Sequence, residues 1–113
     1  LQGGEDVFNT VAVNLPQLIY GGEGSDVLFG SPGSDLLDGG NGDDILIGAT
    51  DLATGGDTII GGEGNDILWG SEADDSILGG NGRDWIVGSV SDLAGTDTIF
   101  GGAGEDMIMS GFF

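Results

Sequence analysis

A nine-residue unit repeats along the chain, and it restricts the fold more than any other feature of the sequence. Its pattern is G-G-x-G-x-D-x-U-x, where U is Leu or Ile: a glycine-rich turn ends in an aspartate, and a three-residue strand follows. Such a strand is too short to be stable alone, so neighbouring units must supply its hydrogen bonds. The repeat therefore predicts a stack of coils. Intact copies begin at Gly21, Gly39, Gly61, Gly79 and Gly101.

An aspartate holds the sixth position of the unit along most of the chain. Most of the gaps are nine residues, and two gaps of thirteen come from four-residue insertions in the turns 48–56 and 88–96. The insertions have the same length and lie forty residues apart, so a longer period overlies the shorter one. These aspartates are Asp6, Asp26, Asp35, Asp44, Asp57, Asp66, Asp75, Asp84, Asp97 and Asp106.

The repeat indicates a single domain over residues 1–113, a length that suits one domain. We expect degenerate first turns in residues 1–20, with Gln17 where an aspartate belongs. Regular repeats then fill residues 21–109, and residues 110–113 form a tail or a junction.

The charge of the chain limits its partners. Twenty acidic residues face a single basic one, and the net charge of −19 argues against nucleic acids and anionic membrane surfaces. The sequence contains neither cysteine nor histidine, which removes disulfides and the usual ligands of zinc, copper and haem. Adjacent carboxylates such as Asp43 and Asp44 diverge in a turn and have no nucleophile beside them, so we do not expect an enzyme. Regularly spaced carboxylates instead favour a fold that requires cations.

The turn has the composition of a calcium site. Glycine allows a tight backbone, whose carbonyl oxygens can converge on one centre. Calcium takes six to eight oxygen ligands, and two stacked turns can supply them from carbonyls and an aspartate each. The eighth position of each unit is expected to point inward and form a narrow core of Leu28, Leu37, Leu46, Ile59, Leu68, Ile77, Ile86, Ile99 and Ile108.

Over residues 3–109 the sequence resembles the RTX (repeats-in-toxin) family of secreted bacterial proteins. The resemblance implies an all-β fold, a right-handed parallel β-roll (a β-solenoid) with two repeats per coil. It also implies Ca²⁺ between turns two repeats apart, bridged by aspartates, and export in an unfolded state by a type I route. The metal-binding residues that it implies are Asp6, Gly22, Gly24, Asp26, Asp35, Gly40, Gly42, Asp44, Asp57, Gly62, Gly64, Asp66, Asp75, Gly80, Gly82, Asp84, Asp97, Gly102, Gly104 and Asp106.

With two repeats per coil, successive turns alternate between two edges of the roll. Nearly all of the turns on the first edge are intact, and the second edge has both insertions. We expect a strong row of ions on the first edge and a weaker or interrupted row on the second, about eight ions in total. The first edge comprises Asp6, Asp26, Asp44, Asp66, Asp84 and Asp106, and the second comprises Gln17, Asp35, Asp57, Asp75 and Asp97.

The strands that follow the first edge predict an apolar outer face. Their flanking positions are Val27/Phe29, Ile45/Ile47, Ile67/Trp69, Trp85/Val87 and Met107/Met109. A continuous apolar ribbon is unusual on a soluble monomer and favours a surface covered by another copy, by an insertion that folds back or by a partner domain. We expect self-association, either laterally through this face, which includes Phe29, Trp69 and Trp85, or end to end.

Several functions remain open. The leading hypothesis is a calcium-rigidified segment of an extracellular fibre, adhesin stalk or cell-surface assembly. Residues 110–113 joined to residues 1–9 give thirteen residues, the length of a repeat with an inserted turn, which favours a tandem repeat or a head-to-tail polymer. The alternative is a C-terminal secretion and folding module of a type I-secreted exoenzyme or toxin. A third interpretation is a carbohydrate- or surface-binding face made by the inserted turns.

Overall fold

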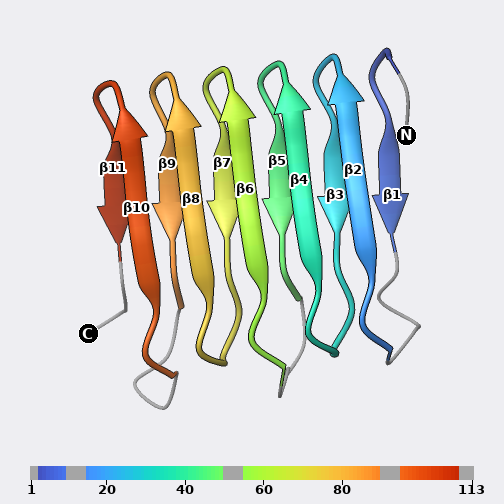
Figure 1. Cartoon of the computed structure of the whole chain (residues 1–113), viewed down its shortest axis with the longest axis vertical. Coiled ribbons are helices and arrows are strands. Elements are labelled where there is room, and N and C mark those ends of the chain that lie inside the picture. The colour runs from blue at the N-terminus through green and yellow to red at the C-terminus, as the bar shows by residue number, and fades with distance from the viewer. Residues whose placement is uncertain (1–2, 10–14, 50–54, 90–94, 110–113) are drawn as a thin grey trace.

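The computed structural model describes residues 3–9, 15–49, 55–89 and 95–109 of the chain. Within these ranges the chain forms parallel strands and no helix (Figure 1). The junction of residues 110–113 with residues 1–9 falls partly outside them. The strands are β1 (Val7–Asn9), β2 (Leu18–Glu23), β3 (Val27–Phe29), β4 (Leu36–Asn41), β5 (Ile45–Ile47), β6 (Thr58–Glu63), β7 (Ile67–Trp69), β8 (Ser76–Asn81), β9 (Trp85–Val87), β10 (Thr98–Ala103) and β11 (Met107–Met109).

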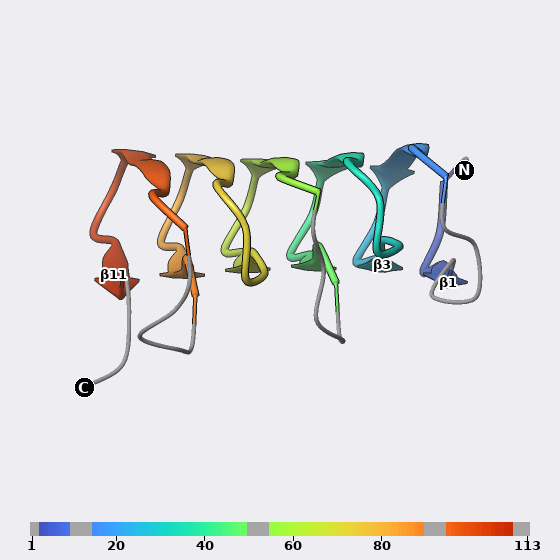
Figure 2. The same cartoon turned by 90° about the horizontal axis from the view of Figure 1, so that it is seen from below.

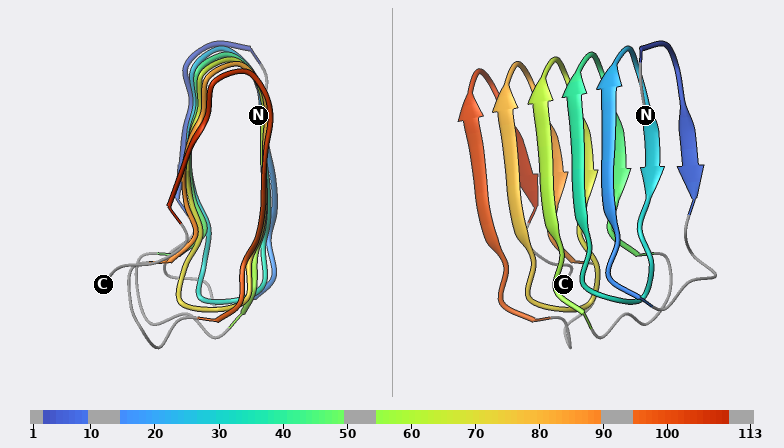
Figure 3. Two further views of the ribbon diagram at one scale, coloured as in Figure 1. Left: turned by 90° about the vertical axis from the view of Figure 1, so that its left-hand side faces the viewer. Right: turned by 45° about the vertical axis from the view of Figure 1, so that its right-hand side comes forward.

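The strands form two parallel sheets that face each other. One sheet has the order β1-β3-β5-β7-β9-β11, and the other has the order β10-β8-β6-β4-β2. Figure 2 shows the two layers, and Figure 3 shows along the stack that successive coils nearly superimpose. Each coil contains one strand of each sheet and therefore two repeats. The prediction of an all-β parallel β-roll is confirmed.

Residues of the same repeat position pair along each sheet. Ile45 pairs with Val27 of the coil before it and with Ile67 of the coil after it. The separation along the chain is eighteen positions in the first pair and twenty-two in the second, as it is for the aspartates of the same coils. The coils thus alternate between a shorter and a longer length, because a coil with an inserted turn has four more residues. Since the strands stay in register, the turn absorbs the whole insertion, and the sum of the two lengths gives the predicted forty-residue period.

The prediction of three-residue strands is correct for the odd-numbered strands and wrong for β2, β4, β6, β8 and β10, which have six residues each. In these strands the pairing continues into the following first-edge turn, where Gly22 pairs with Gly40 and Glu23 with Asn41. The stacked glycine turns are thus part of the sheet, which fixes their geometry along the roll.

The eighth position of the repeat faces the interior, as predicted, in the middle of the roll. Leu28, Leu37, Leu46, Ile59, Leu68, Ile77 and Ile86 are fully buried, and Ile19, Phe8 and Ile99 extend this core. The prediction is wrong for Ile108, whose side chain is 46% exposed. Ile108 lies on β11, the last strand of its sheet among the described residues, so it has a neighbouring strand on one side only.

Candidate metal centres

The aspartates form two rows, one along each edge of the roll. The first-edge turns lie at the top of Figure 1, where each even-numbered strand leads into the next odd-numbered one, and the second-edge turns lie at the bottom. Backbone bonds between coils hold each row: the N–H of Val27 donates to the carbonyl of Asp6 at 2.8 Å, and that of Ile45 to Asp26 at 2.9 Å. The structure therefore stacks the carboxylates as the spacing predicts.

From Asp26 to Asp106, one oxygen of each aspartate in the two rows accepts a hydrogen bond from the coil before it. The N–H of Asp26 donates to Oδ1 of Asp44 at 2.8 Å, and the N–H of Asp44 donates to Oδ1 of Asp66 at 2.8 Å. The second edge has the same type of hydrogen bond: the backbone N–H of Gln17 donates to Oδ1 of Asp35 at 2.7 Å. Gln17 therefore occupies the predicted place in the row. Each carboxylate is therefore fixed in one orientation.

The second oxygen, Oδ2, has no hydrogen-bond partner in six aspartates, although it is buried. Four of the six side chains form an uninterrupted series on the first edge and are 1% exposed. A buried carboxylate oxygen without a partner is costly, and natural proteins pair it with a cation or a donor. These oxygens therefore fit the chemistry of a bound divalent cation. The six belong to Asp26, Asp44, Asp57, Asp66, Asp84 and Asp97.

The glycine at the first position of each turn leaves room beside this oxygen. A Cβ atom added to Gly39 would lie 2.4 Å from Oδ2 of Asp44 and 2.7 Å from the carbonyl oxygen of Gly61, one coil further on. At Gly61 the corresponding distances, to Asp66 and Gly79, are 2.4 and 2.5 Å. A carboxylate oxygen and a carbonyl oxygen thus converge on a space that only glycine leaves free.

These first-position glycines were missed as site residues by the sequence reasoning, which selected positions two and four. Their signal was present: glycine occupies this position in every turn from Asp26 to Asp106, including turns that lack glycine at positions two or four. They are needed for space and not for a left-handed backbone, because none of them has a positive φ angle. The set is Gly21, Gly30, Gly39, Gly48, Gly61, Gly70, Gly79, Gly88 and Gly101.

Glycines at positions two and four of the first-edge turns do adopt positive φ, 99° at Gly40 and 125° at Gly42. A Cβ atom on Gly40 would lie 2.3 Å from the carbonyl oxygen of Gly22, and one on Gly42 would lie 2.0 Å from that of Gly24. The carbonyls of each turn therefore point toward the turn of the next coil. Carbonyl and carboxylate oxygens are the ligands that calcium prefers.

The buried carboxylates of the two rows favour the binding of either protons or cations, because both neutralise their charge. The pKa of Asp57 and of Asp66 is raised to about 7, mainly by burial and in smaller part by neighbouring aspartates of the same row, against the lowering effect of the backbone hydrogen bond. Burial also raises the pKa of Asp44, Asp75, Asp84 and Asp97. A divalent cation would reverse this tendency, because it stabilises the charged form.

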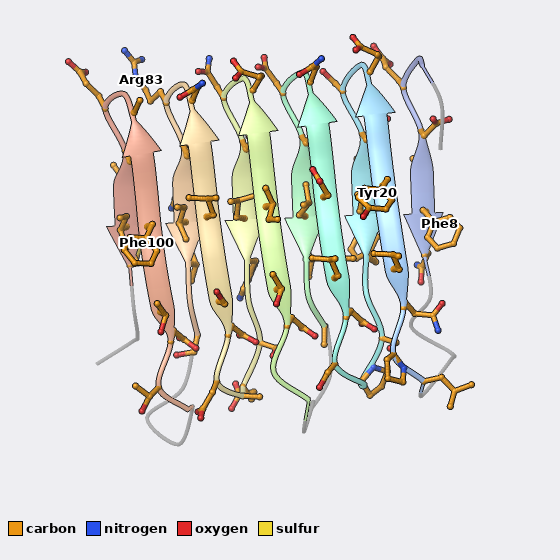
Figure 4. The ribbon with its side chains drawn as sticks, viewed as in Figure 1. Phe8, Tyr20, Arg83 and Phe100 are labelled. Carbon is orange, nitrogen blue, oxygen red and sulfur yellow. The ribbon has the colours of Figure 1, made fainter. Side chains whose placement is uncertain are left out.

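The rim of the first edge is polar and exposed. The side-chain amide of Asn41 donates to Glu23 at 2.9 Å, and that of Asn81 donates to Glu63 at 2.7 Å. Arg83 extends outward at this rim (Figure 4), and its Nη2 lies 3.7 Å from Oε2 of Glu105. These contacts are solvent-exposed and contribute little to stability. Among the described residues no group of three or more acidic side chains forms a metal cluster. Each turn directs one aspartate, that of the sixth position, into its row, so most ligands in these turns would have to be backbone oxygens.

Comparison with known proteins identifies the repeat. The family model of the RTX calcium-binding nonapeptide repeat matches residues 20–51, 53–86 and 89–113. No curated protein and no solved structure matches the chain. Within the described residues there is no helix long and apolar enough to span a membrane.

Proposed function

Because the chain belongs to the RTX calcium-binding nonapeptide repeat family, we propose that it is a structural module that folds outside the cell when it binds Ca²⁺. The observation that carries this proposal is the row of buried Oδ2 atoms without partners on the first edge. Without cations these carboxylates lie about 5 Å from their neighbours in the row, the spacing of adjacent strands, and repel one another. Calcium binding would then supply the free energy of folding.

The proposed ligands come from pairs of stacked first-edge turns. Asp44 and Asp66 would each give Oδ2, and glycine carbonyls of the two turns would complete the set. When bound, calcium neutralises the carboxylates and ties two coils together. If every interval of the first edge and those from Asp35 to Asp97 were filled, about eight ions would bind. The first-edge ligands are Asp6, Gly22, Gly24, Asp26, Gly40, Gly42, Asp44, Gly62, Gly64, Asp66, Gly80, Gly82, Asp84, Gly102, Gly104 and Asp106.

A calcium titration of the metal-free chain tests the proposal. Circular dichroism should show a disordered chain in EDTA and a cooperative gain of β structure on addition of millimolar Ca²⁺, while native mass spectrometry counts several bound ions. A chain that keeps its full β content after exhaustive dialysis against EDTA would overturn the proposal. Saturation at one or two ions would reject the row of sites.

The wider context that we propose is a segment of an extracellular fibre, adhesin stalk or cell-surface assembly. The forty-residue period supports it, because such a unit can be repeated along a stack without loss of register. The alternative is a secretion and folding module of a type I-secreted exoenzyme or toxin. Further repeats in the complete gene would favour the fibre, and a catalytic domain upstream would favour the module. Electron micrographs with and without chelator would show whether calcium-dependent filaments form.

Lateral self-association is a second proposal, and it concerns the apolar ribbon on the outer face of the odd-numbered strands. Trp69 is 41% exposed and Trp85 is 50% exposed, and Phe29 is half-buried on β3 of the same sheet, two strands from Trp69. The ribbon of a second copy would cover both tryptophans. Replacing Trp69 and Trp85 by serine should abolish a calcium-dependent dimer in analytical ultracentrifugation, and unchanged association would contradict it. The carbohydrate-binding alternative depends on residues 50–54 and 90–94, which lie outside the described residues.

A further inference from the structure

Two aspartates of the second edge differ from all of their buried neighbours. Oδ2 of Asp35 accepts the N–H of Ser31, and Oδ2 of Asp75 accepts the N–H of Ser71 at 2.6 Å. In both turns the serine is buried, 0% exposed at Ser31 and 6% at Ser71. The oxygen that lacks a partner elsewhere in the rows is therefore satisfied in these two turns by the turn itself.

The serine hydroxyl groups also lie within hydrogen-bond distance of the aspartate carboxylates. Oγ of Ser31 lies 3.1 Å from Oδ1 of Asp35 and 3.1 Å from the carbonyl oxygen of Leu15, so its single proton is shared between these acceptors, and Oγ of Ser71 lies 3.4 Å from both oxygens of Asp75. Hydrogen bonds to an ionised acceptor are about twice as strong as neutral ones. An N–H directed at Oδ2 also places positive charge where a cation would have to sit, so the turn and the ion compete for the same oxygen.

The absence of glycine at position two changes the path of the backbone, and the length of the turn decides whether that path reaches the carboxylate. Ser31 and Ser71 precede their aspartates by four residues. In the open turns ending at Asp57 and Asp97, the position-two residues Ala49 and Ser89 precede the aspartate by eight residues. In first-edge turns this position has a positive φ angle, 108° at Gly62 and 110° at Gly80. No residue other than glycine adopts a positive φ among the described residues, so Ser31 and Ser71 take another conformation. That conformation turns their N–H inward, onto the carboxylate.

Asp57 and Asp97 provide an internal comparison in the same row. Oδ1 of Asp57 accepts the N–H of Asp35 at 2.8 Å, and Oδ1 of Asp97 accepts that of Asp75 at 3.0 Å, so their side chains are oriented like the others. Their Oδ2 atoms nevertheless lack a hydrogen-bond partner. Closed and open carboxylates therefore alternate along the second edge.

We propose that the turns ending at Asp35 and Asp75 are closed by Ser31 and Ser71 in place of calcium, so that only alternate coils of the second edge use the metal. This inference rests on the proposed calcium-dependent folding. It assigns Asp35 and Asp75 a structural role, as hydrogen-bond acceptors, and leaves Asp57 and Asp97 as the second-edge carboxylates available to cations.

Counting bound ions in matched variants of the full chain tests the inference. At saturating Ca²⁺, native mass spectrometry should show that Asp57→Asn loses at least one ion relative to the wild type, whereas Asp75→Asn keeps the wild-type number. Loss of an ion in Asp75→Asn equal to that in Asp57→Asn would overturn the inference. Asp66→Asn separates the two proposals: it should also lose an ion, and an unchanged count there would reject the proposed function itself.

A measurement on the unmodified chain covers the case in which Asp75→Asn does not fold. In the calcium-saturated wild type, the amide protons of Ser31 and Ser71 should resonate far downfield and exchange slowly, because each is donated to a carboxylate. Amide protons at ordinary shifts with fast exchange would show that the carboxylates are used otherwise and would overturn the inference.

Discussion

The backbone N–H of Asp44 donates to Oδ1 of Asp66 at 2.8 Å, and Oδ2 of Asp66 is left buried without a hydrogen-bond partner. One carboxylate thus performs two tasks. It orders the turn of the preceding coil through one oxygen and offers the other oxygen to a cation. Because each coil depends on the carboxylate of the next, loss of one aspartate should affect two coils.

Removing a first-edge carboxylate should raise the calcium requirement for folding. We expect Asp84→Asn to increase the calcium concentration at the folding midpoint about tenfold, the lower end of the range for changes at metal sites. The midpoint can be followed by tryptophan fluorescence. Glu5→Gln removes the same charge from an exposed side chain and should leave the midpoint nearly unchanged. Equal shifts in the two variants would mean that only total charge matters.

Acidification should promote folding of the metal-free chain. Burial raises the pKa of Asp57 and Asp66 from 3.8 to about 7, so the folded state binds protons more tightly than the unfolded chain does. This contribution is complete below the unfolded pKa and is lost as the pH rises through about 7. Each group changes the folding equilibrium about tenfold per pH unit between these limits.

In EDTA, β structure measured by circular dichroism should therefore increase as the pH falls from about 8 to about 5. The calcium-loaded chain serves as the control. Its carboxylates are ionised in both the folded and the unfolded state over this range, so its stability should stay nearly constant. A metal-free chain that loses β structure on acidification would contradict the pKa argument.

The space at the first position of the turn should not tolerate a methyl group. In Gly39→Ala the Cβ atom would lie 2.4 Å from Oδ2 of Asp44, and we expect a loss of about 1–3 kcal/mol in the free energy of unfolding at saturating calcium. Gly3→Ala is the matched control, because its Cβ atom would meet nothing closer than Cβ of Glu23 at 3.7 Å. Urea denaturation of both variants measures the difference, and equal stabilities would exclude the crowding.

The core should be least tolerant in its middle. Ile77 is 1% exposed, so Ile77→Ala should cost about 2–5 kcal/mol in the free energy of unfolding. Ile108 holds the same repeat position but is 46% exposed, and Ile108→Ala should cost about half as much or less. Urea denaturation at saturating calcium compares the two, and equal losses would mean that the last coil is covered in solution.

The structural features that could be predicted from the sequence are those that depend on the repeat. The nine-residue spacing predicted stacked coils and the inward-facing eighth position, because both follow from stacking identical units. The two rows of aspartates and the alternation of edges came from the resemblance to the RTX family, which implies two repeats per coil. Periodicity carries no information about the ends of the stack, and for this reason the exposure of Ile108 was not foreseen. The sequence reasoning also missed the role of glycine at position one. Position 39 must be glycine because the folded coil brings a carboxylate oxygen too close for a side chain, and the repeat period does not show this contact.

Shorter and longer coils alternate without any shift in strand pairing. Gly48 and Gly88, at which the longer turns begin, therefore lie on the same margin of the roll at every second coil, about 10 Å apart. The strand register is the same at every coil, whereas the length of the turn can vary. Loops of other lengths and sequences could be grafted at these two places, which would make the roll a scaffold for displaying peptides at fixed intervals.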